Sequence, residues 1–291
     1  MAKIGGAFSV RGASIASSLQ NRPMRSIVAL GIHAFWVTTG LALTLVVWTL
    51  LSHWLGPTRL PSPMSLWPSF VTDLFKNKVL EFQGGGSRGI LPHLLYTIEK
   101  TLLGSLIGCV IGLTVGLAGA RWKSLGVFLD IPLGALRSIP PLAAIPFMVL
   151  WFGPSQAAQL GVVIFYAALM IAVTTSTAVA NLDPIIQQFA QTLGARQGHV
   201  FRTVIMPSIV PELVGGLRVL VGIAWGIEVV SELAGAQQGM GQVFSRMVTF
   251  HKLDVIIEGI IWITLVAAVT DALIVLISRI FTRWAPQNVN Q

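Results

Sequence analysis

The fold is decided by an apolar stretch at residues 97–120, which reads TIEKTLLGSLIGCVIGLTVGLAGA. Beyond Lys100 the stretch carries no charged residue. Its length is that of a helix crossing the hydrocarbon core of a bilayer, which takes about 20 apolar residues. The stretch therefore predicts a transmembrane helix.

Glycines recur at every fourth position of this stretch, at Gly104, Gly108, Gly112 and Gly116. Residues four apart lie on one side of a helix, and small residues there let another helix approach at backbone distance. We expect these glycines to form a helix-packing face. Its partner helix lies either in the same subunit or in a second copy.

The composition extends this prediction to the whole chain. Of its 291 residues 54% are hydrophobic and 10% are charged, whereas soluble chains carry about 25% charged residues. A soluble globular domain is therefore excluded, and an all-α, polytopic membrane protein is predicted. The formal charge of +8 fits basic cytoplasmic loops better than nucleic-acid binding.

Apolar runs bounded by charged residues, prolines or glycines predict six transmembrane helices. They lie at about residues 27–55, 97–120, 125–152, 157–180, 213–233 and 255–281. The third is irregular, because Pro132, Pro140, Pro141 and Pro146 remove amide donors and Arg137 places a charge at depth. We expect that span to be kinked or broken.

The distribution of Lys and Arg predicts the orientation. With the N-terminus inside, ten of the 19 basic residues lie on the inner side and seven on the outer side. Residues 1–26 then form a cytoplasmic arm and residues 285–291 a cytoplasmic tail. A cleaved signal peptide is not indicated, because the apolar run after the basic arm is too long.

Enzymatic and metal chemistry find no support in the motifs. The sequence contains no phosphate-binding GxxxxGK[ST] motif, and Cys109 is its single cysteine. No spacing of Ser, His and Asp indicates a hydrolase triad. The five histidines lack ligand spacing, so we expect no metal site and place these histidines at interfaces or surfaces.

Five ionisable residues fall within the predicted spans: Arg137, Arg218, Glu228, Glu232 and Asp271. Such residues persist in a membrane only where they face protein or water. Arg137 therefore either lines a pathway for anions or forms an internal ion pair with Glu228 or Glu232. Glu228 is accordingly either a specificity determinant or the partner of Arg137.

The most informative loop spans residues 184–207, between the fourth and fifth predicted helices. It contains Gln188-Phe189-Ala190, then Gly194, then, after nine residues, Val204-Ile205-Met206-Pro207. This spacing resembles the signature Glu-Ala-Ala, three residues, Gly, nine residues, Ile-x-Leu-Pro of permease subunits of binding-protein-dependent ABC importers. Gln188, Phe189 and Met206 depart from it.

The resemblance implies a role for this loop. In that family the loop forms a coupling helix that docks into a groove of the ATPase subunit, and a short helix ended by a glycine suits a rigid peg. Its coupling residues here are Gln188, Phe189, Ala190, Leu193, Gly194, Arg196, Phe201 and Pro207. Phe189, Leu193 and Phe201 are the expected apolar anchors.

Other segments are similar to taurine, alkanesulfonate and nitrate or bicarbonate permeases. They are LRSIPPLAAIP at 136–146, LWFG at 150–153, GGLR at 215–218, GIAW at 222–225, SEL at 231–233 and GMG at 239–241. The similarity covers about 91–284 and implies a type I (MetI-like) importer fold. The permease domain would span 27–284, with its core at about 91–284.

The resemblance also implies partners, location and function. The partners would be an ABC ATPase dimer, a second permease copy, a periplasmic solute-binding protein and membrane lipid, in a bacterial inner membrane. This chain would hold no cofactor, because ATP and Mg would bind the ATPase. The expected pathway residues are Arg137, Pro140, Pro141, Glu228 and Glu232.

We therefore interpret the chain as a transport subunit, not an enzyme, that imports a small anion, with taurine or another sulfonate favoured. Nitrate or bicarbonate is the alternative within the family. A proton-coupled secondary transporter, with Glu228, Glu232 and Asp271 as its relay, is the alternative of another class. It would not need a coupling loop and would more often show paired broken helices.

Overall fold

The structure is a computed structural model that describes residues 22–282. The chain divides into two units, residues 1–67 and 68–291, which are described separately. Every regular element among the described residues is helical. The predicted tail at 285–291 and most of the predicted N-terminal arm lie outside the described range.

The first unit contains helix α2 (Arg22–Leu55) and the start of α3 (Pro63–Phe75). Residues Ala34–Leu55 of α2 are long and apolar enough to cross a membrane, and most of their side chains are exposed. Trp48 Nε1 donates a hydrogen bond to the Pro61 carbonyl at 3.0 Å, and Ser52 Oγ donates to the Leu60 carbonyl at 2.7 Å. The chain after α2 therefore folds back onto its last turns.

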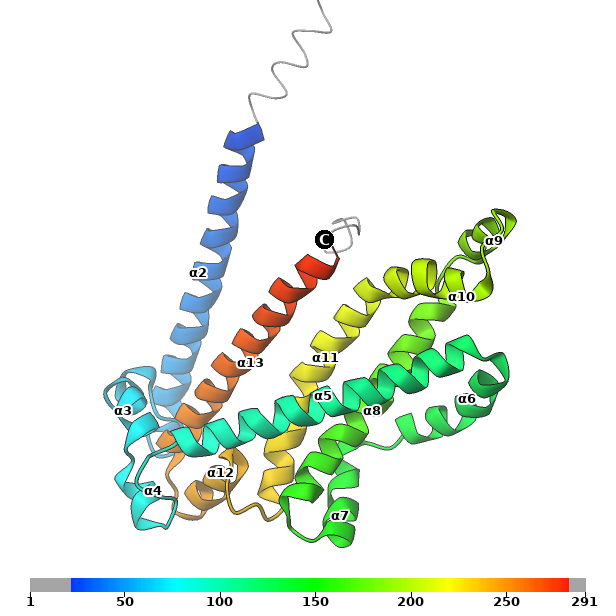
Figure 1. The fold of residues 1–291 in the computed structure, drawn as a ribbon. Helices are drawn as coiled ribbons and strands as arrows, with labels where there is room; N and C mark the ends of the chain where they lie inside the picture. The colour runs from blue at the N-terminus through cyan, green and yellow to red at the C-terminus, as the bar shows by residue number, and fades with distance from the viewer. Residues whose placement is uncertain (1–21, 283–291) are drawn as a thin grey trace, which may run out of the picture. The chain divides into compact units, whose positions relative to one another are not determined.

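The second unit contains the remaining helices (Figure 1). They are α4 (Lys78–Phe82), α5 (Leu91–Arg121), α6 (Lys123–Arg137), α7 (Pro141–Phe152), α8 (Gln156–Ala180), α9 (Pro184–Thr192), α10 (Gln197–Val200), the π-helical turn η1 (Phe201–Ile205), α11 (Met206–Leu233), α12 (Met240–Thr249) and α13 (Leu253–Phe281). The chain of α10, η1 and α11 continues as one apolar span.

Five helical stretches of the described chain are long and apolar enough to cross a membrane, and α6 with α7 makes a sixth if the two count as one span. Those two helices meet at 93°. The predicted break in the third span is therefore confirmed. Two helices begin earlier than predicted, at Leu91 and Met206, each with a proline in its first turn, where the missing N–H costs nothing.

The glycine face of α5 packs along α8, within the same subunit. A Cβ added at Gly104 would lie 2.8 Å from Val163 Cγ1, and one added at Gly112 would lie 2.9 Å from the Ala172 amide nitrogen. Gly108 and Gly116 meet the same helix. Of the two partners left open by the sequence, α8 of the same chain is the one observed.

Helix α3 is held against α13. Ser69 Oγ donates a hydrogen bond to Glu258 Oε1 at 2.6 Å, and the Phe70 ring stacks on Trp262 with centroids 4.7 Å apart. Glu258 is fully buried, and the half-buried Asp73 interacts with it. Two carboxyl groups therefore meet at this contact.

Asp73 is expected to make stability depend on pH. Burial raises its pKa above the usual 3.8; a hydrogen bond with Glu258 lowers it, while the charge of Asp254 raises it further. The folded protein therefore binds the Asp73 proton more tightly than the unfolded chain does. The free energy of unfolding consequently falls as pH rises from the pKa of the unfolded chain through the raised pKa of the folded protein.

The substitution Asp73→Asn removes this ionisation, so its gain in stability should be larger at pH 8 than at pH 4. Thermal unfolding at the two pH values checks this, with Glu81→Gln, an exposed acid on α4, as the matched control. An equal change at both pH values would contradict the assignment.

Candidate functional site

Helix α9 forms a short peg at the end of the unit where α8 ends and where the α10–η1–α11 span begins (Figure 1). Asp183 caps its first turn, accepting a hydrogen bond from the Ile185 amide at 2.8 Å, and Pro184 supplies a fixed φ. The helix ends at Thr192, and the chain turns away at Gly194, whose φ of +83° favours glycine. The Ala195 amide then donates to the Ala190 carbonyl at 3.1 Å, which closes the end.

The peg carries an exposed apolar stripe. Ile185, Phe189 and Leu193 recur at intervals of four, and their side chains are 67%, 64% and 73% exposed. No residue of α9 is buried. Ile185 was not among the predicted anchors, although its spacing from Phe189 was visible in the sequence. Such a stripe is suited to docking on another surface.

The other predicted coupling residues lie around this stripe in different environments. Gln188 and Arg196 are exposed, and Ala190 is half-buried. Phe201, an expected anchor, is half-buried in η1 and packs against a cluster that includes Ile205. Phe201 therefore belongs to the packing beneath the peg, and Pro207 lies in the first turn of α11.

The break between α6 and α7 adjoins a cavity. Arg137 ends α6, Pro140 is extended with ψ 130°, and Pro141 begins α7. A cavity of about 480 Å³ lies between α6 and the neighbouring parts of α5 and α8, and Arg137 and Asp130 are the charged residues that line it. This cavity combines open space with charge.

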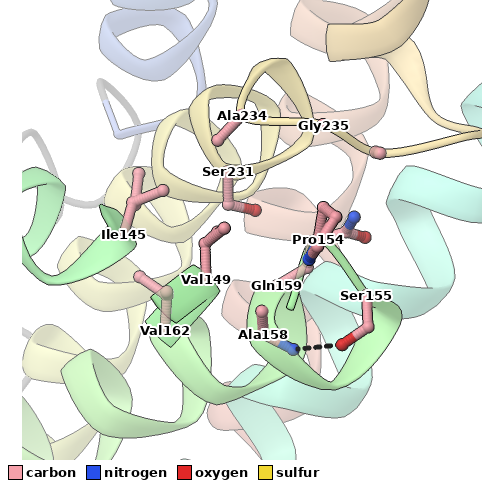
Figure 2. Close-up of a pocket in the computed structure, with 11 residues that line it drawn as sticks. Ile145, Val149, Pro154, Ser155, Ala158, Gln159, Val162, Ser231, Ala234 and Gly235 are labelled. Carbon is pink, nitrogen blue, oxygen red and sulfur yellow. Dashed lines mark hydrogen bonds between the residues drawn. The ribbon is translucent and has the colours of Figure 1, made fainter. Parts of the chain in front are cut away.

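A second pocket lies between α7, α8 and the end of α11 (Figure 2). It is lined mostly by small and aliphatic side chains, among them Ile145, Val149 and Ala158, and by no charged residue. Its polar Ser155 already accepts a hydrogen bond from the Ala158 amide at 3.4 Å. The side chains that line this pocket therefore offer an anion no charged partner.

Glu232 fastens the segment after α11. The carboxylate is fully buried and accepts hydrogen bonds from Thr97 Oγ1 at 2.7 Å and from the Gly241 amide at 2.8 Å. Thr97 Oγ1 in turn accepts from the Met240 amide at 2.9 Å. Glu232 is thus enclosed in a latch between α5 and α12, and its role on the translocation pathway stays a prediction.

Removing this latch should destabilise the protein. Glu232→Ala leaves the buried Gly241 amide without an acceptor and the Thr97 hydroxyl with only the His93 carbonyl, at a cost of about 2 kcal/mol, and Glu232→Gln should cost less. Thermal unfolding of the purified protein measures both. Glu99→Ala, on the exposed side of α5, should change stability by less than about 0.5 kcal/mol. A Glu232→Ala protein as stable as the wild type would argue against the latch.

His93 also belongs to this latch. The Gly239 amide donates to its Nδ1 at 3.2 Å, and its Nε2 lies 3.0 Å from the Gly85 carbonyl. The expectation of a surface position is wrong for His93, because polar backbone in the turn after α11 needs a buried partner. No group of three or more metal-ligating side chains gathers within residues 22–282.

The charges at depth pair differently from the prediction. Arg218 forms a two-bond ion pair with Asp271, at 2.7 and 2.9 Å, which joins α11 to α13. In the described part of the chain Arg137 makes no ion pair with Glu228 or Glu232. Glu228 is fully buried, and neither of its oxygens has a hydrogen-bond partner there. The ion-pair interpretation of Arg137 and Glu228 is therefore wrong.

Comparison with known proteins identifies the family. Residues 104–291 match the family described as the binding-protein-dependent transport system inner membrane component. The chain belongs to this family. The permease is thus a multi-pass membrane subunit of an ABC importer, and not an enzyme, as the coupling-loop spacing indicated.

Its relatives include sulfonate and nitrate permeases. It is 27% identical to the taurine transport system permease protein TauC of Escherichia coli, over 84% of this chain and 87% of TauC. It is 30% identical to the putative aliphatic sulfonates transport permease protein SsuC of E. coli, over 82% and 88% of the two chains. It is 26% identical to the nitrate import permease protein NrtB of Synechococcus elongatus, over 69% of this chain and 72% of NrtB.

Solved structures show the same fold. A chain of the MetNI methionine ABC transporter matches with a TM-score of 0.59 at 22% identity, over 66% of this permease and 96% of that chain. The predicted MetI-like, type I importer fold is therefore confirmed.

Proposed function

We propose that this permease imports a small organosulfonate, with taurine favoured, into the cytoplasm at the expense of ATP hydrolysed by a partner subunit. The observation that carries the ATP-driven mechanism is the exposed stripe Ile185, Phe189 and Leu193 on a helix that buries none of its own residues. A transporter that worked alone would gain nothing from such a peg.

The proposed assembly contains two copies of the permease, an ATPase dimer and a periplasmic solute-binding protein. The ATPase subunits bind ATP and Mg, and this chain holds neither. Closure of the ATPase dimer moves α9, and α9 moves α8 and α11, to which it is joined at both ends. Rigid capping by Asp183 and Gly194 suits α9 for transmitting that movement.

The proposed orientation places α9 in the cytoplasm of a bacterium and α12 at the outer face of the inner membrane. The excess of Lys and Arg on the side of the membrane that holds α9 supports this orientation. Both termini are then cytoplasmic. The loaded binding protein docks on the outer side, near α12.

The sulfonate preference follows the relatives TauC and SsuC, and the cavity beside Arg137 supports an anionic solute. A guanidinium group holds oxyanions through paired N–H donors. The break at Pro140 and Pro141 brings that group to the end of α6 beside open space. NrtB makes nitrate the alternative substrate.

Uptake in whole cells tests the proposal. Cells lacking their own sulfonate importers should take up labelled taurine when they express the permease with its ATPase and binding protein. An ATPase that binds but does not hydrolyse ATP should abolish uptake. Uptake that survives this ATPase but collapses with the proton gradient would overturn the proposal, as would uptake of nitrate or bicarbonate without any sulfonate.

A further inference from the structure

The cavity beside α6 holds a carboxylate as well as the guanidinium of Arg137. Asp130 lines the same cavity from the same helix, seven residues earlier. Residues seven apart return to one face of an α-helix after two turns, with Cα atoms about 10.5 Å apart. A negative and a positive charge therefore border one cavity along one helix face.

The surface between these two charges leaves room for a ligand. Leu133 and Gly134 line the cavity from the intervening turn, and a Cβ added at Gly134 would meet nothing within 4 Å. The facing helix α8 contributes Ser176. The cavity is thus apolar in its middle and polar at its margins.

Within residues 22–282, neither Asp130 nor Arg137 forms an ion pair with another side chain. The ion pairs among residues 22–282 join Arg218 to Asp271 and Lys100 to Glu99. Asp130 and Arg137 are both exposed. Ionised residues within membrane segments commonly pair with one another or mark a path for a ligand. Asp130 and Arg137 are seven residues apart, so they are not neighbours on adjacent turns of α6.

We infer that this cavity binds a zwitterion, an aminosulfonate of the taurine class, with its sulfonate on Arg137 and its ammonium group on Asp130. The inference rests on the proposed function, because the sulfonate end is assigned from that function. It goes further by making Asp130 the residue that distinguishes aminosulfonates from other anions. A plain anion leaves the Asp130 carboxylate unpaired and is repelled by it.

Equilibrium binding to the purified permease–ATPase complex, without binding protein, tests this inference. The probes are labelled taurine and isethionate, in which a hydroxyl group replaces the ammonium group. Wild type should prefer taurine by about tenfold, the value of one charge-assisted hydrogen bond. Asp130→Asn should weaken taurine binding about tenfold and should strengthen isethionate binding, because it removes the carboxylate that repels a plain anion.

Matched variants separate charge from folding. Asp130→Glu should keep the preference for taurine, Arg137→Gln should weaken both ligands, and Glu81→Gln, on the exposed face of α4, should change neither. The inference is overturned if Asp130→Asn leaves the taurine-to-isethionate ratio unchanged, or if wild type binds neither ligand. Sulfonate uptake by cells in either case would show that the proposed function still stands.

Discussion

Phe189→Asp is expected to abolish transport and to release the ATPase from the permease. The Phe189 side chain is 64% exposed at the centre of the α9 stripe, between Ile185 and Leu193. A buried aromatic anchor at an interface commonly contributes about 2 kcal/mol or more, which is about 30-fold in the dissociation constant. Aspartate adds the cost of burying an unpaired charge.

Binding of the ATPase to the purified permease, followed by taurine uptake in cells, measures the effect of Phe189→Asp. Phe189→Ala should show a smaller loss in both assays. The permease itself should fold normally, because Phe189 makes little contact within its own chain. The control is Phe82→Asp, because Phe82 is 92% exposed on α4. Retention of the ATPase by Phe189→Asp would show that α9 is not the docking element.

Gly108→Ala is expected to cause a large loss of stability through a single added methyl group. The added Cβ would overlap Ala167 Cβ and lie 2.8 Å from the Ile164 carbonyl oxygen and 3.0 Å from the Ala168 amide nitrogen. None of these atoms belongs to a flexible side chain, so α5 must move away from α8. Overpacking of this kind costs about 1–3 kcal/mol, and Gly108→Leu should prevent the two helices from packing.

Thermal unfolding of the purified permease measures the effect of Gly108→Ala. Gly222→Ala on α11 is the control, because a Cβ there meets nothing within 4 Å, and alanine favours a helix. Adding Ala167→Gly to Gly108→Ala should recover part of the loss by removing one of the overlapping atoms. Equal melting temperatures for Gly108→Ala and wild type would contradict the close approach of α5 and α8.

The number and type of the elements were predictable because their causes are local. Hydropathy over about 20 residues is enough to recognise a span, and the prolines around Arg137 are enough to break one. The coupling peg was also predictable, since Pro184 and Gly194 mark its ends within a short segment. The packing of Phe201 was not predictable, because the π-helical turn that half-buries it has no marker in the sequence.

The sequence by itself determined that this is a membrane protein with a broken span and a short, capped loop helix, because hydropathy and backbone restrictions act between near neighbours. Its resemblance to the importer permeases supplied the permease family and the docking role of that helix. The tertiary structure alone decided the partners of the charges. Thr97 bonds Glu232 across 135 positions of the chain, and Arg218 bonds Asp271 across 53. Such pairs depend on which helices pack together. The same packing leaves Asp130 and Arg137 beside a cavity and not beside charged partners on other described helices.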